Sequence, residues 1–150
     1  MKIAIACDHG GYLLKQVILI WLEENDIDYE DFGCYSTESV DYPVFAERAA
    51  RAVAAGECDK GIVICTTGIG VSIAANKVKG IRAGLAYNTV MARLSREHND
   101  ANVLSLGGRM QSLEDALAMA KVFLETPFSE DPRHVRRIQE LAAYEDAHRA

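Results

Sequence analysis

The chain has 150 residues, of which 49% are hydrophobic and 25% charged, and its formal net charge at pH 7 is −6. This composition is ordinary for a soluble protein with a full-sized core, so we expect a single domain over residues 1–150. An acidic chain is not typical of general nucleic-acid binders, and no apolar run is long enough to span a bilayer. We therefore expect neither nucleic acid nor a membrane as a partner.

The N-terminal segment, residues 1–8, lacks the long apolar region of a signal peptide. The four cysteines, Cys7, Cys34, Cys58 and Cys65, form no Cys-x-x-Cys pair. Together these features indicate free thiols and a cytoplasmic protein. Cys7 ends an apolar run, which predicts a core residue.

Strand-like and helix-like segments alternate along the whole chain. Short β-type runs predict strands over 2–7, 28–32, 60–65, 81–86 and 102–106. Apolar residues at helical spacing, together with capping residues, predict helices over 11–24, 41–55, 70–78, 88–98, 113–125 and 132–144. This alternation predicts an α/β fold, a Rossmann-like three-layer αβα sandwich with a five-stranded parallel sheet.

Ligands of such folds bind at the carboxyl ends of the strands. Three loops with polar residues are expected there: 8–11, 65–68 and 107–109. His98–Asn99–Asp100, at the end of a predicted helix, is a fourth candidate.

The segment Cys65–Gly70, with the sequence CTTGIG, joins an apolar run at 61–64 to a helical pattern. Free N–H groups and the positive end of a helix dipole favour an anion at such a turn, and a thiol there can act as a base or nucleophile. The alternatives are a core cysteine and a tight turn without a ligand. The turn matches neither a dinucleotide fingerprint nor a Walker loop.

Asp8 and His9 follow the first predicted strand. They are either an acid–base or hydrogen-bonding pair at the same sheet edge as Cys65, or a helix N-cap and a solvated loop residue. His98 is either a general acid, since histidine titrates near neutral pH, or a cationic cap at a helix C-terminus. Asn99 either holds a sugar hydroxyl or ends its helix.

Arg133 and Arg137 are one helical turn apart on the last predicted helix, away from its apolar stripe. Such a pair either grips a phosphate or forms a solvated face, and Arg136 could replace one of the two. Arg109, after the fifth strand, is a further candidate. The histidines lack zinc-ligand spacing and no carboxylate cluster suggests magnesium, so we expect no metal.

The predicted helix over 11–24 contains six consecutive apolar residues, 17–22. They cover more than one helix face, whereas a surface helix normally has a single apolar stripe. This excess favours a subunit interface, and hence a homodimer.

Several segments carry a family resemblance together: DHGG at 8–11, DYP at 41–43, CTTGIG at 65–70, SIAANK at 72–77, GIRA at 80–83, SREHNDANVL at 95–104, and Arg133-His134 with Arg137. In these segments the chain resembles ribose-5-phosphate isomerase type B and the related isomerases of galactose 6-phosphate and allose 6-phosphate. The resemblance covers nearly the whole chain, and its motifs are specific in combination.

The resemblance implies an aldose–ketose isomerase of carbohydrate metabolism that needs no cofactor or metal and takes a phosphorylated sugar. With ribose 5-phosphate as substrate, it would serve the pentose phosphate pathway. It also implies a homodimer, which can pair into a tetramer, with sites shared between subunits. We expect the helix at 132–144 to contact the partner subunit.

By residue matching, Cys65 moves the proton between C2 and C1 of the open-chain sugar, and His98 assists ring opening with Asp8 nearby. An anion hole for the enediolate is expected from Thr67, Gly68, Ile69 and Gly70. The other expected substrate-binding residues are His9, Tyr42, Thr66, Asn99 and Arg109, with Arg133 and Arg137 of the partner subunit.

The main alternative substrate is a 6-phosphohexose. A non-catalytic sugar-phosphate sensor would have lost the base or acid, and a flavodoxin-like binding domain would leave Cys65 and His98 without a role. The family usually has Gly where this chain has Thr66, so we expect Thr66 to tune substrate fit, with backbone strain if that position requires a positive φ. The family also usually has Gly where this chain has Pro132.

Overall fold

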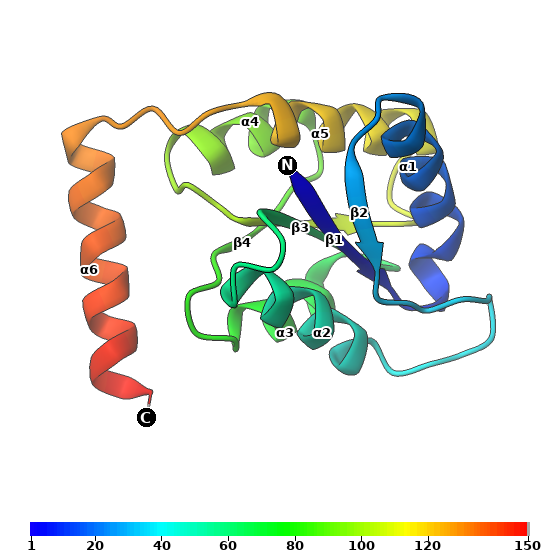
Figure 1. Cartoon of the computed structure of the whole chain (residues 1–150), viewed down its shortest axis with the longest axis horizontal. Helices are drawn as coiled ribbons and strands as arrows, with labels where there is room; N and C mark the ends of the chain where they lie inside the picture. The colour runs from blue at the N-terminus through cyan, green and yellow to red at the C-terminus, as the bar shows by residue number, and fades with distance from the viewer. Residues whose placement is uncertain (150) are drawn as a thin grey trace.

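The structure, a computed structural model, describes residues 1–149 (Figure 1). Its sheet consists of β1 (Lys2–Cys7), β2 (Asp28–Asp31), β3 (Lys60–Cys65), β4 (Ala83–Leu85) and β5 (Val103–Gly107). All neighbouring strands are parallel, in the order β2-β1-β3-β5-β4. The predicted α/β fold with a five-stranded parallel sheet is therefore confirmed.

The helices are α1 (Tyr12–Glu24), α2 (Tyr42–Ala54), α3 (Ile69–Asn76), α4 (Thr89–Glu97), α5 (Leu113–Glu125) and α6 (Pro132–His148). Figure 1 shows α1, α4 and α5 over one face of the sheet and α2 and α3 over the other. The predicted strand at 81–86 is shorter than expected, and the last helix extends beyond residue 144. A short 3-10 turn, His9–Gly11, precedes α1.

Both faces of the sheet are buried, which explains the continuous apolar runs of its central strands. On one face, Ile18 and Leu22 of α1 and Phe123 of α5 belong to the larger core. On the other face, the small side chains Ala46 and Ala49 let α2 approach the strands closely.

The apolar run at 17–22 is largely accounted for within the chain. Ile18, Leu19 and Leu22 are buried, and Val17 and Trp21 are partly buried, because α1 packs against both the sheet and α5. Ile20 alone within the run is exposed, at 56%. The inference of a subunit interface from this run is therefore not supported, and a dimer must be argued from other surfaces.

A buried ion pair fastens the segment after β2 to the end of β1. The Lys15 side chain is fully buried, and its Nζ lies 2.7 and 2.9 Å from the two carboxylate oxygens of Asp31. The same ammonium donates to the Cys34 carbonyl, and the Cys34 N–H donates to the Cys7 carbonyl at 2.8 Å. The pair therefore supports the end of β1, directly before Asp8.

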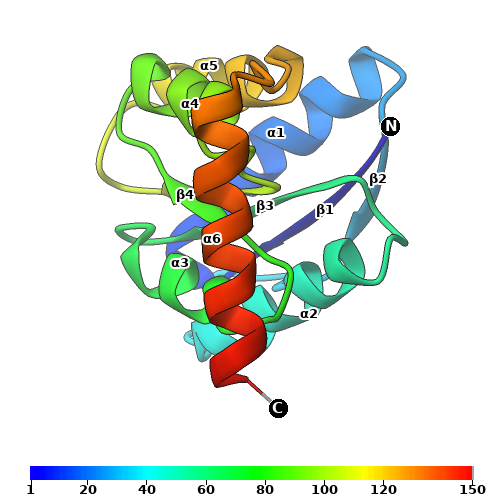
Figure 2. The same cartoon turned by 90° about the vertical axis from the view of Figure 1, so that its left-hand side faces the viewer.

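Helix α6 stands beside the sandwich in Figure 1 and crosses in front of the sheet in Figure 2. It begins at Pro132, behind an Asp131 N-cap, and a proline suits the first helical turn because no N–H is needed there. Of its residues, His134 alone is buried. A cavity of about 440 Å³ separates α6 from the region of β4. No helix within residues 1–149 is long and apolar enough to cross a membrane.

We predict that Lys15→Met lowers the free energy of unfolding by about 3 kcal/mol, because it leaves the Asp31 carboxylate unpaired in a largely buried place. The exposed pair Lys2–Glu30 provides the control, and Lys2→Met should cost less than about 1 kcal/mol. Urea unfolding of both variants measures the difference. Equal losses of unfolding free energy in the two variants would show that the buried pair stabilises the fold no more than the exposed pair does.

Candidate active site

Cys65 is the last residue of β3 and lies at the topological switch point of the sheet. From the neighbouring strands β1 and β3, the chain connects to strands on opposite sides. β1 and β3 are adjacent, with β2 on one side and β5 and β4 on the other. The Asp8 N–H donates to the Ile64 carbonyl at 3.0 Å, and Cys65 pairs with Gly107 of β5. Asp8, Cys65 and Gly107 therefore lie side by side at the crevice where α/β folds bind ligands.

The turn after Cys65 directs a backbone donor at the sulfur. The Cys65 side chain is buried, with 5% of the residue exposed, and its Sγ accepts the Gly68 N–H at 3.1 Å. Gly68 has a φ of 82°, in the left-handed region, and an added Cβ would lie 2.9 Å from the Gly107 nitrogen. Glycine is therefore required here on both counts.

The predicted anion hole is partly occupied by the turn itself. The Gly68 N–H is held by Cys65, and the Ile69 N–H donates to Thr67 Oγ1 at 3.1 Å. The first N–H groups of a helix have no acceptor within that helix, so α3 still directs donors at this edge.

Two of the other cysteines, Cys7 and Cys58, have raised pKa values. Burial raises the pKa of Cys7 to about 12, with a further contribution from Cys34, whose sulfur is 3.9 Å away. Burial also raises the pKa of Cys58. Cys7 is thus a core thiol, as the sequence indicated, whereas Cys65 is in contact with a helix N-terminus.

Asp8 and His9 have defined hydrogen-bond partners next to Cys65. Asp8 is buried and caps the short turn that follows it, because its Oδ1 accepts the Gly10 N–H at 2.9 Å. His9 Nδ1 accepts the Val40 N–H at 3.2 Å. The proton of a neutral His9 ring is therefore on Nε2, which remains free to donate.

Thr66 packs against the Asp8 loop. A Cβ added to Gly10 would lie 2.2 Å from Thr66 Oγ1, and a Cβ added to Gly108 would lie 2.3 Å from the Gly10 carbonyl oxygen. The three loops therefore touch at glycines. Thr66 does not have a positive φ, so the backbone strain considered for this position does not arise.

Two tyrosines and one arginine complete this edge. The Tyr42 ring lies against Gly70, where an added Cβ would come within 2.6 Å of ring carbon Cε1. The Tyr87 hydroxyl donates to the Thr67 carbonyl at 3.0 Å. Tyr87 was missed from the sequence, although its place directly after the fourth strand is a usable signal. Arg109 is exposed, and its backbone N–H donates to the Thr66 carbonyl at 3.3 Å.

His98 and Asn99 lie at the opposite edge of the sheet. They follow α4, which returns from the carboxyl end of β4, and Asn102 just beyond them accepts the Gly61 N–H at 2.9 Å. Gly61 and Cys65 are four peptide steps apart on β3, or about 13 Å. Grouping His98 with the loops around Cys65 is therefore wrong for a single chain, because a helix between parallel strands runs back to their amino ends.

The start of α6 adds basic residues to this second edge. The His98 and His134 rings stack with centroids 4.3 Å apart, and Arg133 Nη2 lies 3.4 Å from His134 Nε2. Burial lowers the pKa of His134, and His98 and Arg133 lower it further. Arg133 and Arg137 are both exposed. No group of three or more potential metal-ligating side chains of His, Cys, Asp or Glu occurs within residues 1–149.

Comparison with known proteins shows which family the chain belongs to. Residues 3–141 match the family described as Ribose/Galactose Isomerase. The chain is 46% identical over 144 residues to ribose-5-phosphate isomerase B of Escherichia coli (strain K12), covering 96% of each chain. Its structure is similar to that of Clostridium thermocellum ribose-5-phosphate isomerase B, with a TM-score of 0.96 and 50% identity over 99% of both chains.

A second solved structure is that of ribose-5-phosphate isomerase B from Mycoplasma genitalium with bound ribulose-5-phosphate. It has a TM-score of 0.91 and 39% identity, and the match covers 97% of this chain and 96% of that one. The chain therefore belongs to the ribose/galactose isomerase family of sugar-phosphate isomerases, as its combined motifs indicated.

Proposed function

We propose that this protein interconverts ribose 5-phosphate and ribulose 5-phosphate. The observation that carries the proposal is the Cys65 sulfur, which lies at the topological switch point beside Asp8 and accepts a backbone N–H from the start of α3. The relatives named ribose-5-phosphate isomerase B, at 46% and 50% identity over almost the full chain, support this substrate.

The chemistry assigned to Cys65 is a proton shuttle. Its thiolate removes the proton from C2 of the open-chain aldose, which leaves an enediolate across C1 and C2. The same sulfur then returns a proton to C1, the hydroxyl proton on O2 passes to O1, and C2 becomes the ketose carbonyl. Those N–H groups of Thr67–Gly70 that Cys65 Sγ and Thr67 Oγ1 do not already hold would stabilise the negative charge as it develops on the sugar oxygens.

Ring opening precedes that step, because ribose 5-phosphate is mostly a closed furanose. Opening the ring places a proton on O4 and removes one from O1, so it needs an acid and a base. His98 of the partner subunit assists this ring opening, with Asp8 nearby at the Cys65 edge. One chain holds His98 and Cys65 at opposite edges, so a single chain does not suffice for both steps.

A homodimer solves this separation. Two-fold symmetry makes contacts reciprocal, so each copy can give its His98 edge to the other copy's Cys65 edge. Exposed apolar side chains near the carboxyl ends of β3, β4 and β5 support burial by a second copy: Ile69, Ile73, Tyr87, Val90, Met91 and Met110. Arg133 and Arg137 of the partner subunit, together with His9, would then hold the phosphate, and Asn99 and Arg109 would bind sugar hydroxyls.

The second candidate substrate is a 6-phosphohexose, since the matching family also includes galactose isomerases. The same proton transfer would act on a sugar that is one carbon longer. Thr66 is the residue that we expect to influence this choice, because its side chain packs between the Cys65 turn and the Asp8 loop.

We predict that Cys65→Ala lowers the turnover of ribose 5-phosphate about a thousandfold, because it removes the proton carrier. Binding of ribose 5-phosphate, measured by calorimetry, should change little, since the phosphate contacts remain. Cys58→Ala, a buried cysteine away from this edge, should keep normal turnover. Wild-type turnover in Cys65→Ala would remove Cys65 from the mechanism.

We predict that mixing Cys65→Ala chains with His98→Asn chains restores activity. Each mixed dimer has one site with both defects and one site with neither. Random pairing of equal amounts makes about half of the dimers mixed, so roughly a quarter of all sites should recover. The measurement is turnover after co-refolding, with mixed dimers verified by mass spectrometry. If mixed dimers form without recovering activity, each subunit builds its own complete site.

We predict that Thr66→Gly changes the ratio of ribose 5-phosphate to allose 6-phosphate turnover by about tenfold. The free energy of unfolding should change by less than about 1 kcal/mol, because Thr66 is only partly buried and its backbone is unstrained. Steady-state kinetics on both sugars measures the ratio. An unchanged ratio would show that the Thr66 side chain does not reach the substrate.

A further inference from the structure

Arg96 is a buried arginine that the proposed chemistry does not use. The residue is 7% exposed, and its Nη1 donates to Asp100 Oδ1 at 2.8 Å and to the Ala101 carbonyl at 2.7 Å. Its Nε donates to the Thr126 carbonyl at 3.1 Å. A guanidinium is tolerated in such a place when its donors are paired, so Arg96 is fixed by the groups around it.

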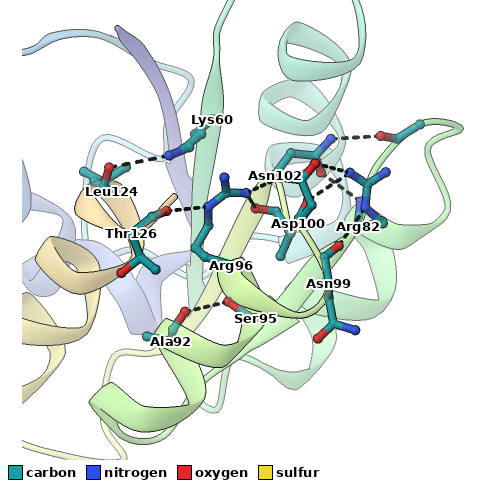
Figure 3. Close-up of polar contacts among 12 residues, drawn as sticks. Lys60, Arg82, Ala92, Ser95, Arg96, Asn99, Asp100, Asn102, Leu124 and Thr126 are labelled. Carbon is teal, nitrogen blue, oxygen red and sulfur yellow. Dashed lines mark hydrogen bonds and ion pairs between the residues drawn. The ribbon is translucent and has the colours of Figure 1, made fainter. Parts of the chain in front are cut away.

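Arg82 approaches the same turn from the start of β4. Its Nε donates to the Asn99 carbonyl at 3.0 Å, and its Nη2 donates to the Asp100 carbonyl at 2.8 Å. The Asp100 carboxylate lies between the two arginines, with Oδ1 bonded to Arg96 and Oδ2 3.4 Å from Arg82 (Figure 3). We call Arg82, Arg96 and Asp100 the turn clamp.

The backbone of the turn would close without this carboxylate. The Asp100 N–H donates to the Arg96 carbonyl and the Ala101 N–H to the Ser95 carbonyl, the pattern with which helices commonly end at a left-handed residue. Asp100 is that residue, with a φ of 44°, where glycine would be free of strain. What Asp100 adds over glycine is a charge that joins the two arginines.

The turn clamp binds carbonyl groups of the turn and leaves the side chains of His98 and Asn99 outside these hydrogen bonds. Three consecutive carbonyls, of Asn99, Asp100 and Ala101, accept from the two arginines. Figure 3 shows the Asn99 side-chain amide pointing away from Arg82. On the other side of Asn99, the His98 ring rests against His134.

We propose that the turn clamp is a positioning device for the isomerase reaction, which sets the direction in which His98 and Asn99 are presented to the partner subunit. This inference rests on the proposed function, in which His98 assists ring opening. The clamp residues touch no substrate and act through the turn. Loosening the clamp therefore impairs ring opening and leaves proton transfer at Cys65 intact.

Two assays separate these steps. Ribulose 5-phosphate cannot close a furanose ring because its O5 carries the phosphate, so exchange of its C1 hydrogen for deuterium in D₂O requires proton transfer alone. In that exchange the sulfur removes a C1 proton, the resulting thiol exchanges with solvent, and deuterium returns to C1. Conversion of ribose 5-phosphate requires ring opening as well.

The test variant is Arg82→Met, because Arg82 is partly exposed and its loss leaves Arg96 paired with Asp100. We expect conversion of ribose 5-phosphate to fall by about tenfold or more, since small misplacements of catalytic groups have effects of this size. Exchange at C1 should stay within about threefold of wild type. Arg82→Lys should recover part of the conversion, because one ammonium replaces only some of the bonds.

Arg51→Met is the matched control, since it breaks an Arg–carboxylate pair on the exposed face of α2. It should leave conversion and exchange at wild-type values. The His98 ring resonances in NMR spectra should shift in Arg82→Met and stay in place in Arg51→Met, which tests positioning without activity.

The proposal is overturned if Arg82→Met lowers exchange and conversion by the same factor, lowers neither, or leaves the His98 resonances unchanged. Failure of the proposed function gives a different result, because the wild-type protein itself would then show no exchange at C1 of ribulose 5-phosphate. The NMR comparison would still report whether the clamp positions His98.

Discussion

The length of the central strands separates Cys65, proposed for proton transfer, from His98, proposed for ring opening. Cys65 and Asp8 lie at the carboxyl ends of β3 and β1, while the turn after α4 returns to the amino ends of β4 and β5. No side-chain rotation spans the intervening sheet, which is about 13 Å across between Gly61 and Cys65. For a reaction that uses both Cys65 and His98 we therefore propose a second copy of the chain, which would bind at the exposed surfaces near Cys65 and along α6.

Different contacts fix the residues at the Cys65 edge and at the His98 edge. At the Cys65 edge, glycines at positions 10, 68 and 108 let three loops touch, and a backbone N–H fixes the sulfur. At the His98 edge, charged side chains take the place of close backbone contact, and the turn clamp and the His134 ring surround one exposed turn. The first edge resembles a preformed anion site, whereas the second holds the groups that we propose to meet the Cys65 edge of a second copy.

The sequence was sufficient to predict the alternating fold and the residues that gather at the carboxyl ends of the strands, because the position of a loop at a parallel sheet edge follows from chain order. Chain order also places His98 at the amino ends of the strands, because the predicted helix over 88–98 runs back from the fourth strand to the start of the fifth. Grouping His98 with the loops at the carboxyl ends overlooked this. The Lys15–Asp31 pair and the His98–His134 stack join elements far apart in the chain, so no local pattern predicts them. The apolar run at 17–22 misled for the same reason, because α1 buries two faces inside its own domain.

The proposed site shared between two subunits is tested most directly by a crystal structure of the Cys65→Ala protein with ribulose 5-phosphate bound. The proposed mechanism predicts that C1 and C2 of the sugar lie against residue 65, and that the phosphate lies near His9. It also predicts that His98 and Arg137 next to the sugar come from the partner subunit. A bound sugar whose polar contacts all come from one chain would contradict the shared site.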